Sequence, residues 1–265
     1  RANVVVATAQ ALAGSTDSAR TRLTELCDRL FIDEAHHVAA RTWRSLTDLF
    51  AGKEIVQFTA TPFREDGQHL GGHLAYAYPL RLAQKNGYFA LINYRSIIDL
   101  ADPDRAVAVA AIAQLRVDLA AGLDHLLMAR VSSVARSKEV IELYQELAGD
   151  LNPLRIDTGM AESTGKKRRE ALLAGTSRIV VCVNMLGEGF DLPALKVAAI
   201  HDPQKSLAVT LQFIGRFTRV AGENLGEASA FVPLQVAGID DRLRRLYGED
   251  ADWNEVIRDL TEREV

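Results

Sequence analysis

Two adjacent carboxylates at the end of an apolar run are the first residues of this sequence that could do chemistry. The run Leu30-Phe31-Ile32 leads directly into Asp33 and Glu34. In phosphoryl-transfer sites, a carboxylate after a buried strand helps to hold Mg²⁺ at the nucleotide phosphates, and a neighbouring acid can orient or deprotonate the attacking water. Asp33 suits the first role and Glu34 the second. A solvated acidic turn after a core strand is the alternative, and it would be the better one if the pair stood alone.

A second apolar run, Ile55 to Phe58, leads into a turn that carries two hydroxyl side chains, Thr59 and Thr61. Taken alone, this turn would be an ordinary loop whose hydroxyls satisfy nearby backbone groups. Its place after a strand, a short distance downstream of the acidic pair, favours a contribution to the same site.

The second half of the chain holds a strand-like run, Val180 to Val183, followed by a glycine turn that contains Gly189 and Asp191. Because glycine lacks a side chain, Gly189 permits a ligand to approach the backbone closely. A carboxylate accepts hydrogen bonds from hydroxyl groups, so Asp191 can bind a ribose. Both are candidate nucleotide contacts, although the same block without its context is only a strand with a glycine turn.

Gln212, Arg216 and Arg219 are separated by four and three residues. On a helix this spacing puts all three side chains on one stripe. A planar guanidinium presented to a transferring phosphate can stabilise its charge, which is the role of an arginine finger. We assign Arg219 to this role ahead of Arg216. The other interpretation is a helix with surface arginines, which the apolar residues beside them disfavour.

Taken together, the four stretches resemble motifs II, III, V and VI of the superfamily 2 helicases and translocases, including restriction-enzyme motor subunits. Asp33-Glu34-Ala35-His36 is similar to motif II, residues 59–62 to motif III, residues 180–193 to motif V and residues 212–219 to motif VI. The resemblance implies a motor of two RecA-like domains with ATP and Mg²⁺ in the cleft between them. It also implies that His36 couples the ATP site to the second domain.

Three weaker matches accompany these motifs. Residues 6–12 resemble motif Ib or Ic, residues 126–132 resemble motif IV, and residues 156–159 resemble the strand and loop that follow it. The resemblance implies that Thr8, Arg130 and Thr158 contact phosphates of a nucleic-acid strand, and that Thr59 and Thr61 help to couple this contact to ATP. Each of these residues taken singly is more often part of the scaffold.

The phosphate-binding loop of this family, Gly-x-x-x-x-Gly-Lys followed by Ser or Thr, does not occur in the 265 residues. Gly52-Lys53 is followed by Glu54, and Gly165-Lys166 is followed by a second lysine. Two explanations stay open: a sequence that begins after this loop, which we favour, or a natural chain that does not hydrolyse ATP by itself. The catalytic roles therefore describe the parent protein, and we expect the segment alone to be inactive.

The elements that must position these residues follow an α/β pattern, in which short apolar runs alternate with longer segments of helical period. We therefore predict an α/β fold of mostly parallel sheets. The predicted strands are residues 3–7, 29–32, 54–59, 125–129, 154–157, 177–184, 196–201 and 228–233. The predicted helices are residues 104–121, 137–148, 164–174 and 207–220.

The pattern becomes irregular between Thr61 and about Asp104, where several glycines and prolines occur, and we place a domain boundary near residue 95. Residues 1–95 are then the later part of a first RecA-like domain that is incomplete at its N-terminus. Residues 96–236 form a second RecA-like domain, and residues 237–265 form a charged helical extension.

Composition excludes several function classes. The formal net charge is −4, with 31 Lys and Arg against 35 Asp and Glu, so binding of nucleic acid depends on local placement of charge. Cys27 and Cys182 match neither a zinc spacing nor a disulfide framework. No apolar run approaches the roughly 20 residues needed to span a bilayer. We expect a cytoplasmic protein with no membrane partner.

The expected partner is nucleic acid, DNA in preference to RNA, because residues 59–67 and 188–193 are more similar to DNA translocases than to RNA-specific members of the superfamily. Nuclease or specificity subunits are further expected partners. Two alternatives remain: a catalytically inactive module that binds nucleic acid or a protein partner, and the motor part of a nuclease complex. The intact set of Asp33, Glu34, Arg216 and Arg219 argues against the inactive module.

Overall fold

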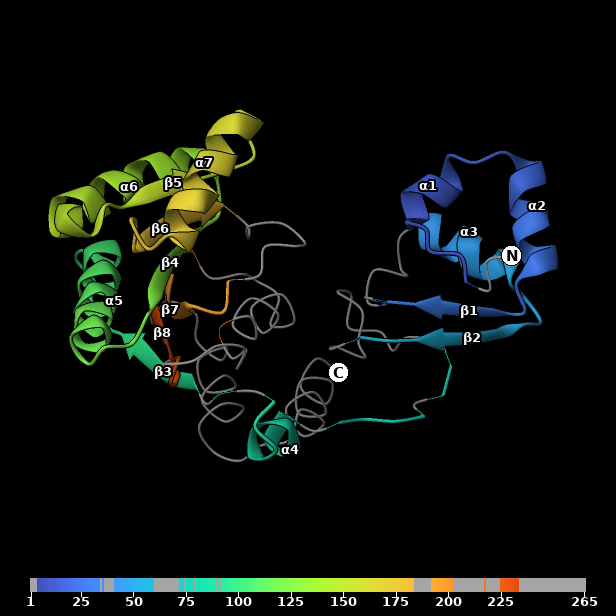
Figure 1. The fold of residues 1–265 in the computed structure, drawn as a ribbon, viewed down its shortest axis with the longest axis horizontal. Helices are drawn as coiled ribbons and strands as arrows, with labels where there is room; N and C mark the ends of the chain where they lie inside the picture. The colour runs from blue at the N-terminus through green and yellow to red at the C-terminus, as the bar shows by residue number, and fades with distance from the viewer. Residues whose placement is uncertain are drawn as a thin grey trace. The chain divides into compact units, whose positions relative to one another are not determined.

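The structure, a computed structural model, describes residues 4–33, 35, 41–59, 72–73, 75–78, 80–88, 90, 92–183, 192–202, 217 and 225–233. It divides the chain into two compact units, Arg1–Ala75 and Tyr76–Val265 (Figure 1). Residue 95, where the sequence suggests a boundary, lies inside a strand of the second unit, so the division comes earlier in the chain. The expected helices at 207–220 and 237–265 lie outside the described residues, apart from Phe217.

The first unit contains a pair of parallel strands, β1 (Arg29–Ile32) and β2 (Glu54–Gln57). Its described helices are α1 (Ala9–Ala13), α2 (Asp17–Leu26) and α3 (Arg41–Leu49). The strands are paired in register, with Ile32 opposite Gln57, so both leave the sheet at the same edge. Helix α2 begins where the Thr16 hydroxyl accepts a hydrogen bond from the Ala19 amide at 3.2 Å, as an N-cap residue does.

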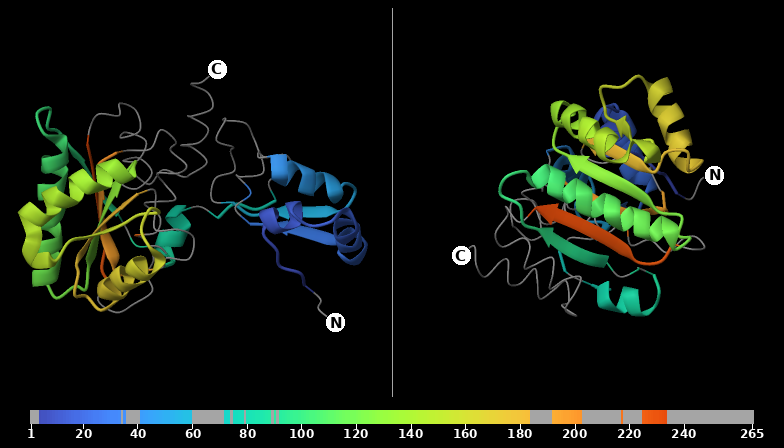
Figure 2. Two further views of the ribbon diagram at one scale, coloured as in Figure 1. Left: turned by 90° about the horizontal axis from the view of Figure 1, so that it is seen from above. Right: turned by 90° about the vertical axis from the view of Figure 1, so that its left-hand side faces the viewer.

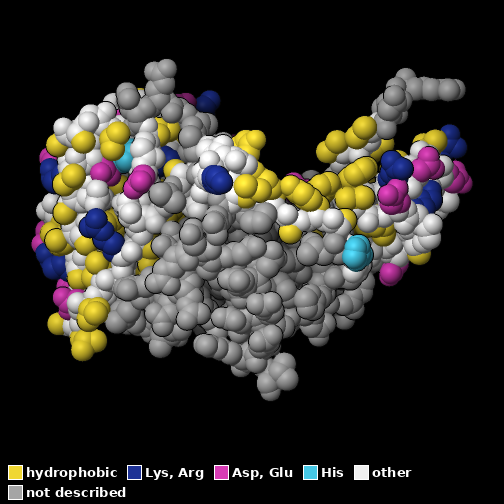
Figure 3. Space-filling view, turned by 90° about the horizontal axis from the view of Figure 1, so that it is seen from below, with side chains coloured by type: hydrophobic (Ala, Val, Ile, Leu, Met, Phe, Trp, Pro, Cys, Tyr) yellow, Lys and Arg dark blue, Asp and Glu magenta, His cyan; other side chains and the backbone are white. Residues whose placement is uncertain are grey.

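The apolar run at 3–7, predicted as a buried strand, is not a strand in its described part. Val4 and Val6 are 75% and 92% exposed, and the described sheet of this unit consists of β1 and β2. An apolar run becomes a strand only where a neighbouring strand pairs with its backbone groups, and β-propensity alone does not supply that neighbour. Hydrophobic side chains at the surface of the first unit are coloured yellow in Figure 3.

The second unit is built on a six-stranded sheet in which every pair of neighbours is parallel. The strand order is β3-β8-β7-β4-β6-β5. The strands are β3 (Ile92–Ile97), β4 (Leu126–Val131), β5 (Leu154–Ile156), β6 (Ile179–Val183), β7 (Leu195–Ile200) and β8 (Ala228–Pro233). The described helices are α4 (Leu80–Lys85), α5 (Pro103–Ala120), α6 (Val134–Ala148), the short η2 (Gly149–Leu151) and α7 (Glu162–Leu173).

The central strands are buried on both faces, and this explains their nearly continuous apolar sequences. All residues of β4, β7 and β8 are buried. One face packs against α5 and α6, in a core that includes Leu115 and Tyr144. The other face forms a core that includes Leu172 of α7 and Phe217. Helices therefore lie on both sides of the sheet, as Figure 2 shows.

Helix α5 shows how local sequence sets the ends of these elements. Asp102 caps its start by accepting a hydrogen bond from the Arg105 amide at 3.0 Å, and Pro103 occupies the first turn, where its missing N–H costs nothing. The helix ends just before Gly122, whose φ of 82° suits glycine. Among the described helices, including this longest one, none combines the length and the apolar content that crossing a membrane would require.

Seven predicted strands and three predicted helices are present in the structure, with ends that differ by a few residues. The sequence prediction missed β3, because its residues alternate apolar and polar within a stretch interrupted by glycine and proline. That alternation reflects its place at the edge of the sheet, where polar side chains reach solvent. It also missed the short α1 and α4 and the more polar α2 and α3.

Leu115 provides a test of the core beneath α5, because its side chain is fully buried while Val117 on the same helix is 62% exposed. We expect Leu115→Ala to lower the free energy of unfolding by about 2–5 kcal/mol, through lost burial and the cavity left behind. The matched change Val117→Ala is expected to alter it by less than about 0.5 kcal/mol. Urea unfolding followed by circular dichroism measures both, and equal effects would contradict this packing.

Candidate nucleotide and nucleic-acid site

Asp33 of the acidic motif and Thr59 of the threonine turn lie on neighbouring segments of the first unit. Beyond the last paired residues of β1 and β2, the Phe58 amide donates to the Ile32 carbonyl oxygen at 2.8 Å, and the Ala35 amide donates to the Phe58 carbonyl oxygen at 2.9 Å. These two hydrogen bonds continue the pairing past the strands. Asp33 and Thr59 are therefore held on adjacent segments, while the roles expected for motifs II and III stay predictions.

Asp33 lies at the carboxyl edge of the parallel pair with its side chain exposed, and Thr59 is half-buried. Ligands of parallel α/β sheets bind outside the carboxyl ends of the strands. A carboxylate at that edge is a suitable oxygen ligand for Mg²⁺, which is commonly held by one or two carboxylates together with the substrate phosphates. The carboxylate oxygens of Asp33 therefore fit a nucleotide-bound Mg²⁺. Glu34, His36 and Thr61 lie outside the described residues.

Thr8 is exposed and starts α1, where its hydroxyl oxygen accepts a hydrogen bond from the Ala11 amide at 3.1 Å. A threonine hydroxyl has one proton and two acceptor positions, so this cap leaves the proton available for a phosphate oxygen. Thr158 is also exposed and follows β5, in a turn where the Gly159 amide donates to Asp157 Oδ1 at 2.9 Å. Both positions are compatible with the phosphate contacts expected from the sequence.

Arg130 differs from these threonines because its side chain lies inside the second unit. The residue is 4% exposed, and its guanidinium donates to the backbone carbonyl oxygen of Asp202. Burial lowers the pKa of Arg130. The structure therefore gives Arg130 a contact that joins the ends of β4 and β7, and the expected role toward nucleic acid stays a prediction.

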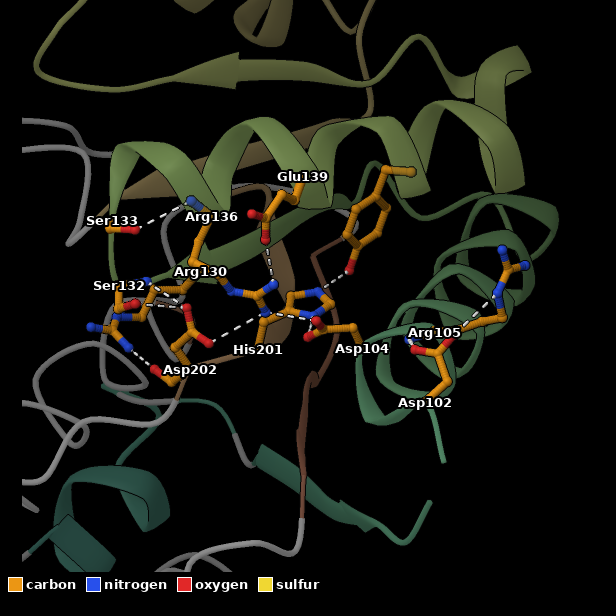
Figure 4. A network of polar contacts seen from close by, with 11 residues as sticks. Asp102, Asp104, Arg105, Arg130, Ser132, Ser133, Arg136, Glu139, His201 and Asp202 are labelled. Carbon is orange, nitrogen blue, oxygen red and sulfur yellow. Dashed lines mark hydrogen bonds and ion pairs between the residues drawn. The ribbon is translucent and has the colours of Figure 1, made fainter. Parts of the chain in front are cut away.

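A connected set of polar side chains surrounds this contact at the carboxyl edge of the sheet (Figure 4). Asp202, which follows β7, accepts hydrogen bonds from the Ser132 amide at 2.8 Å and from the Ser132 hydroxyl at 2.9 Å. Arg136 of α6 lies 3.4 Å from Asp202 and 2.6 Å from Asp104 of α5. Two helix starts and two strand ends are thereby linked by charge-assisted hydrogen bonds.

His201 extends this network into the core. Its Nδ1 lies 2.9 Å from Asp104 Oδ1, and its Nε2 lies 3.0 Å from the hydroxyl of Tyr144, which is fully buried. An ionised carboxylate can only accept, so the Nδ1–H of His201 donates to Asp104. Burial raises the pKa of Tyr144, so its hydroxyl stays protonated beside Nε2 of His201.

The network holds both of its carboxylates in the charged form. The hydrogen bond from His201, together with Arg136, lowers the pKa of Asp104 from 3.8 to about 2. Burial alone would raise the pKa of Asp202, but the hydrogen bonds from Ser132 and the charge of Arg136 lower it. Burial would lower the pKa of Arg136, but the hydrogen bonds to Asp104 and Glu139 raise it. The edge thus carries fixed charges with defined partners.

Lys196 connects the sheet to the predicted arginine motif. This residue of β7 is 1% exposed, and its ammonium donates to the backbone carbonyl oxygen of Phe217 at 3.1 Å. Burial lowers the pKa of Lys196. Phe217 packs in the core and lies within the 212–219 motif. Gln212, Arg216 and Arg219, like Gly189 and Asp191 of the glycine block, lie outside the described residues.

The sequence analysis missed Asp104, Ser132, Arg136, His201 and Asp202. A signal was present, because His201 and Asp202 directly follow an apolar run of the sequence, as Asp33 and Glu34 do. The partners of this pair come from positions far away in the chain, so their role becomes visible only with the topology known. Among the described residues, no group of three or more His, Cys, Asp or Glu is arranged to hold a metal ion by itself.

Comparison with known proteins gives two family matches in one chain. Residues 1–64 match the family of the type III restriction enzyme res subunit, and residues 119–221 match the helicase conserved C-terminal domain. The DNA 3'-5' translocase XPB2 of Sulfurisphaera tokodaii is 27% identical over 259 residues, which cover 77% of this chain and 59% of the translocase. A 51.5 kDa protein of a Lactococcus phage is 27% identical over 220 residues, covering 73% of this chain and 47% of that protein.

Solved structures show the same fold. A fragment assigned as the HsdR subunit of a type I restriction enzyme from Vibrio vulnificus YJ016 is similar with a TM-score of 0.62 and 21% identity, over 83% of this chain and 46% of that one. S. cerevisiae Dbp5 bound to RNA and ADP BeF3 is similar with a TM-score of 0.55 and 14% identity, over 94% of this chain and 68% of that one. The chain thus spans about half to two thirds of the length of these proteins.

Parallel sheets and a fold similar to that of these structures define an α/β protein of RecA-like domains. The two family matches, in this order, then identify the chain as a member of the superfamily 2 helicases and translocases. The resemblance stated from the motifs is confirmed.

Asp104 offers a test of the polar network through pH. Its pKa is about 2 in the folded chain against an ordinary 3.8, so protonation favours the unfolded chain and the stabilisation is lost as the pH falls from about 3.8 to about 2. We expect Asp104→Asn to lower the free energy of unfolding by about 1–3 kcal/mol at neutral pH, the range for losing a charged partner. This deficit should shrink toward zero below about pH 2.

Urea unfolding at a series of pH values measures this difference. The matched change Glu142→Gln, at an exposed position of α6, is expected to shift stability by less than about 0.5 kcal/mol at each pH. A deficit of Asp104→Asn that stays constant down to pH 2 would show that the carboxylate charge does not support the network.

Proposed function

We propose that the protein is an ATP-dependent nucleic-acid translocase or helicase that acts on DNA in preference to RNA. It hydrolyses ATP with residues from both RecA-like domains. The observation that carries this proposal is the pairing of the segments after β1 and β2, which holds Asp33 beside Thr59 at the carboxyl edge. Adjacent acidic and hydroxyl side chains at that edge can bind a metal–phosphate group and respond to its hydrolysis.

Each motif residue then has a distinct role. Asp33 binds the Mg²⁺ of the nucleotide, and Glu34 orients the attacking water and accepts its proton. Gly189 and Asp191 contact the nucleotide, and His36 couples the ATP site to the second domain. Gln212 shares the stripe of Arg216 and Arg219 that faces the ATP. The charge that develops on the transferring phosphate is stabilised by Arg219, with Arg216 beside it in the motif.

DNA is preferred on two of these similarities, while Dbp5, whose structure is also similar, is bound to RNA. One relative is named a DNA 3'-5' translocase, and one structural neighbour is a restriction-enzyme subunit. Thr8, Thr59, Thr61, Arg130 and Thr158 are the proposed contacts to the strand and its coupling to ATP. Nuclease or specificity subunits are proposed partners, as the restriction-enzyme similarity suggests. An end of the second RecA-like domain near residue 236, a charged extension at residues 237–265 and a cytoplasmic location are proposed with them.

The alternative function is a module that binds nucleic acid or a protein partner without turnover. The 265 residues hold no Gly-x-x-x-x-Gly-Lys-Ser/Thr loop, which supports weak or absent ATP binding by this segment alone. The complete set of Asp33, Glu34, Arg216 and Arg219 supports the motor, because a site without turnover has no physical need for all four.

The deciding experiment is steady-state ATP hydrolysis by the 265-residue chain, with and without DNA, beside a longer form that carries a phosphate-binding loop upstream. We expect DNA-stimulated hydrolysis by the longer form only. Hydrolysis by the short chain would show that another element binds the phosphates. No hydrolysis by either form would favour the binding module.

Glu34→Gln tests the role of the proposed general base in the longer form. Glutamine keeps the shape of the side chain but cannot accept the proton, so we expect ATP binding to be retained and turnover to fall by about 10²–10⁴-fold. Nucleotide binding and single-turnover hydrolysis measure the two effects separately. Turnover at the parental rate would remove Glu34 from this role.

Arg219→Ala tests the proposed arginine finger in the same form. Loss of a guanidinium that contacts only the transition state should lower kcat by about 10³–10⁵-fold with little change in nucleotide affinity. Arg216→Ala is the companion variant, and the larger loss in kcat identifies the finger. A loss of affinity with kcat unchanged would make Arg219 a simple binding residue.

A further inference from the structure

Three exposed tyrosines form a cluster at the beginning of the second unit, on either side of α4. Tyr76, Tyr78 and Tyr88, here called the tyrosine patch, are 76%, 41% and 65% exposed. Aromatic side chains carry large apolar surfaces that folded proteins usually bury at least in part. Three of them together at the surface therefore suggest a binding surface rather than a chance exposure.

The rings of the patch are held in a defined arrangement. The Tyr76 and Tyr78 rings are stacked with centroids 6.4 Å apart and an interplanar angle of 18°. The Tyr78 and Tyr88 rings meet edge to face with centroids 6.2 Å apart. Asn86 Nδ2 donates to the Tyr78 hydroxyl at 2.7 Å, and the Tyr88 amide donates to the Ala83 carbonyl oxygen at 2.8 Å. A ligand would thus meet rings that are already ordered.

The local charge of this stretch is opposite to that of the whole chain. Residues 67–98 contain no Asp or Glu, although the chain has 35 acidic residues and a net charge of −4. The same stretch contains Arg81, Lys85 and Arg95. Lys85 lies at the exposed end of α4, three residues before Tyr88. The charged residues of this stretch are therefore all cations, which favours an anionic ligand.

Exposed rings in a stretch whose charged residues are all cations match the chemistry of a single nucleic-acid strand. Every nucleobase has a π-face that can stack on a tyrosine, and the phosphates between bases are attracted by lysine and arginine. In a duplex the bases stack on each other, so only an unpaired strand offers free faces. We propose that the tyrosine patch binds unpaired bases of a single-stranded nucleic acid by stacking, with Lys85 at the phosphates.

This inference rests on the proposed function, since a motor on nucleic acid supplies such a strand, and it adds a contact outside the motifs. The patch belongs to the second unit and contains none of the motif residues. Stacking tolerates any base, so the patch would follow a strand without regard to its sequence.

The test measures binding of a short labelled oligothymidylate to the 265-residue chain by fluorescence anisotropy. Tyr76→Ala and Tyr88→Ala are each expected to weaken binding by about fivefold or more, the effect of losing one base–aromatic stack. Tyr76→Phe and Tyr88→Phe keep the ring and should bind as the parent does. Val117→Ala, which removes an equally exposed apolar side chain on α5, is the matched control and should leave binding unchanged.

Two further measurements separate stacking from phosphate attraction. An oligonucleotide of the same length with abasic sites keeps the phosphates but offers no base to any ring, so the parent chain should bind it at least as weakly as the single alanine variants bind oligothymidylate. Lys85→Ala should instead reduce the slope of log affinity against log salt by about 0.7, the value for one phosphate of a single strand. The abasic comparison uses the parent chain alone, so it remains informative if an alanine variant fails to fold.

The outcomes distinguish the patch from the proposed function. A parent chain that binds neither single-stranded nor duplex DNA would overturn the patch and count against the proposed function. Binding by the parent that persists unchanged in the alanine variants would overturn the patch alone. Alanine variants that bind normally but unfold at lower urea concentration would show that another part of the protein covers these rings, which also contradicts the inference.

Discussion

Parallel pairing of strands is the constraint on which the rest of this structure depends. Because every described strand pair is parallel, all carboxyl ends within one sheet meet at one edge, however far apart they lie in the sequence. Asp33 and Thr59 become neighbours in this way, and so do Arg130 and Asp202. In each unit, the strand topology therefore brings residues that are distant in the sequence to one edge, and hydrogen bonds then form between these neighbours.

In the second unit, the polar network at the carboxyl edge lies next to apolar cores on both faces of the sheet. The charged groups of this network are stable so close to the cores because each has a partner. Asp104 is paired with His201 and Arg136, and Asp202 with Ser132 and Arg136. Removal of one member would leave its former partner charged and poorly solvated. This costs more stability than replacing the whole group by apolar side chains. The same network fixes the starts of α5 and α6 relative to β4 and β7, so rigidity at this edge has an electrostatic origin.

Much of the fold follows from the sequence, because short apolar runs bounded by turn residues favour strands buried on both faces. The residues at 126–131, 179–183, 195–200 and 228–233 are of this kind. Strand β3 was not predicted, because this edge strand alternates polar and apolar side chains. For the site, adjacency of motifs II and III was predictable from strand order, whereas the link between Asp104 and His201 depends on a pairing across 97 positions that no local pattern encodes.

Lys196, the buried lysine of β7, matters for interpreting sequence differences between variants of this protein. Lys196 lies outside every motif, yet its ammonium donates a hydrogen bond to the backbone carbonyl oxygen of Phe217. In the sequence, Phe217 lies between the two arginines of the 212–219 segment. A comparison of sequences limited to the motifs would pass over position 196. A natural variant or an engineered library that changed Lys196 would remove its hydrogen bond to Phe217 while every motif residue stayed the same. The motif sequences alone would then not explain the defect.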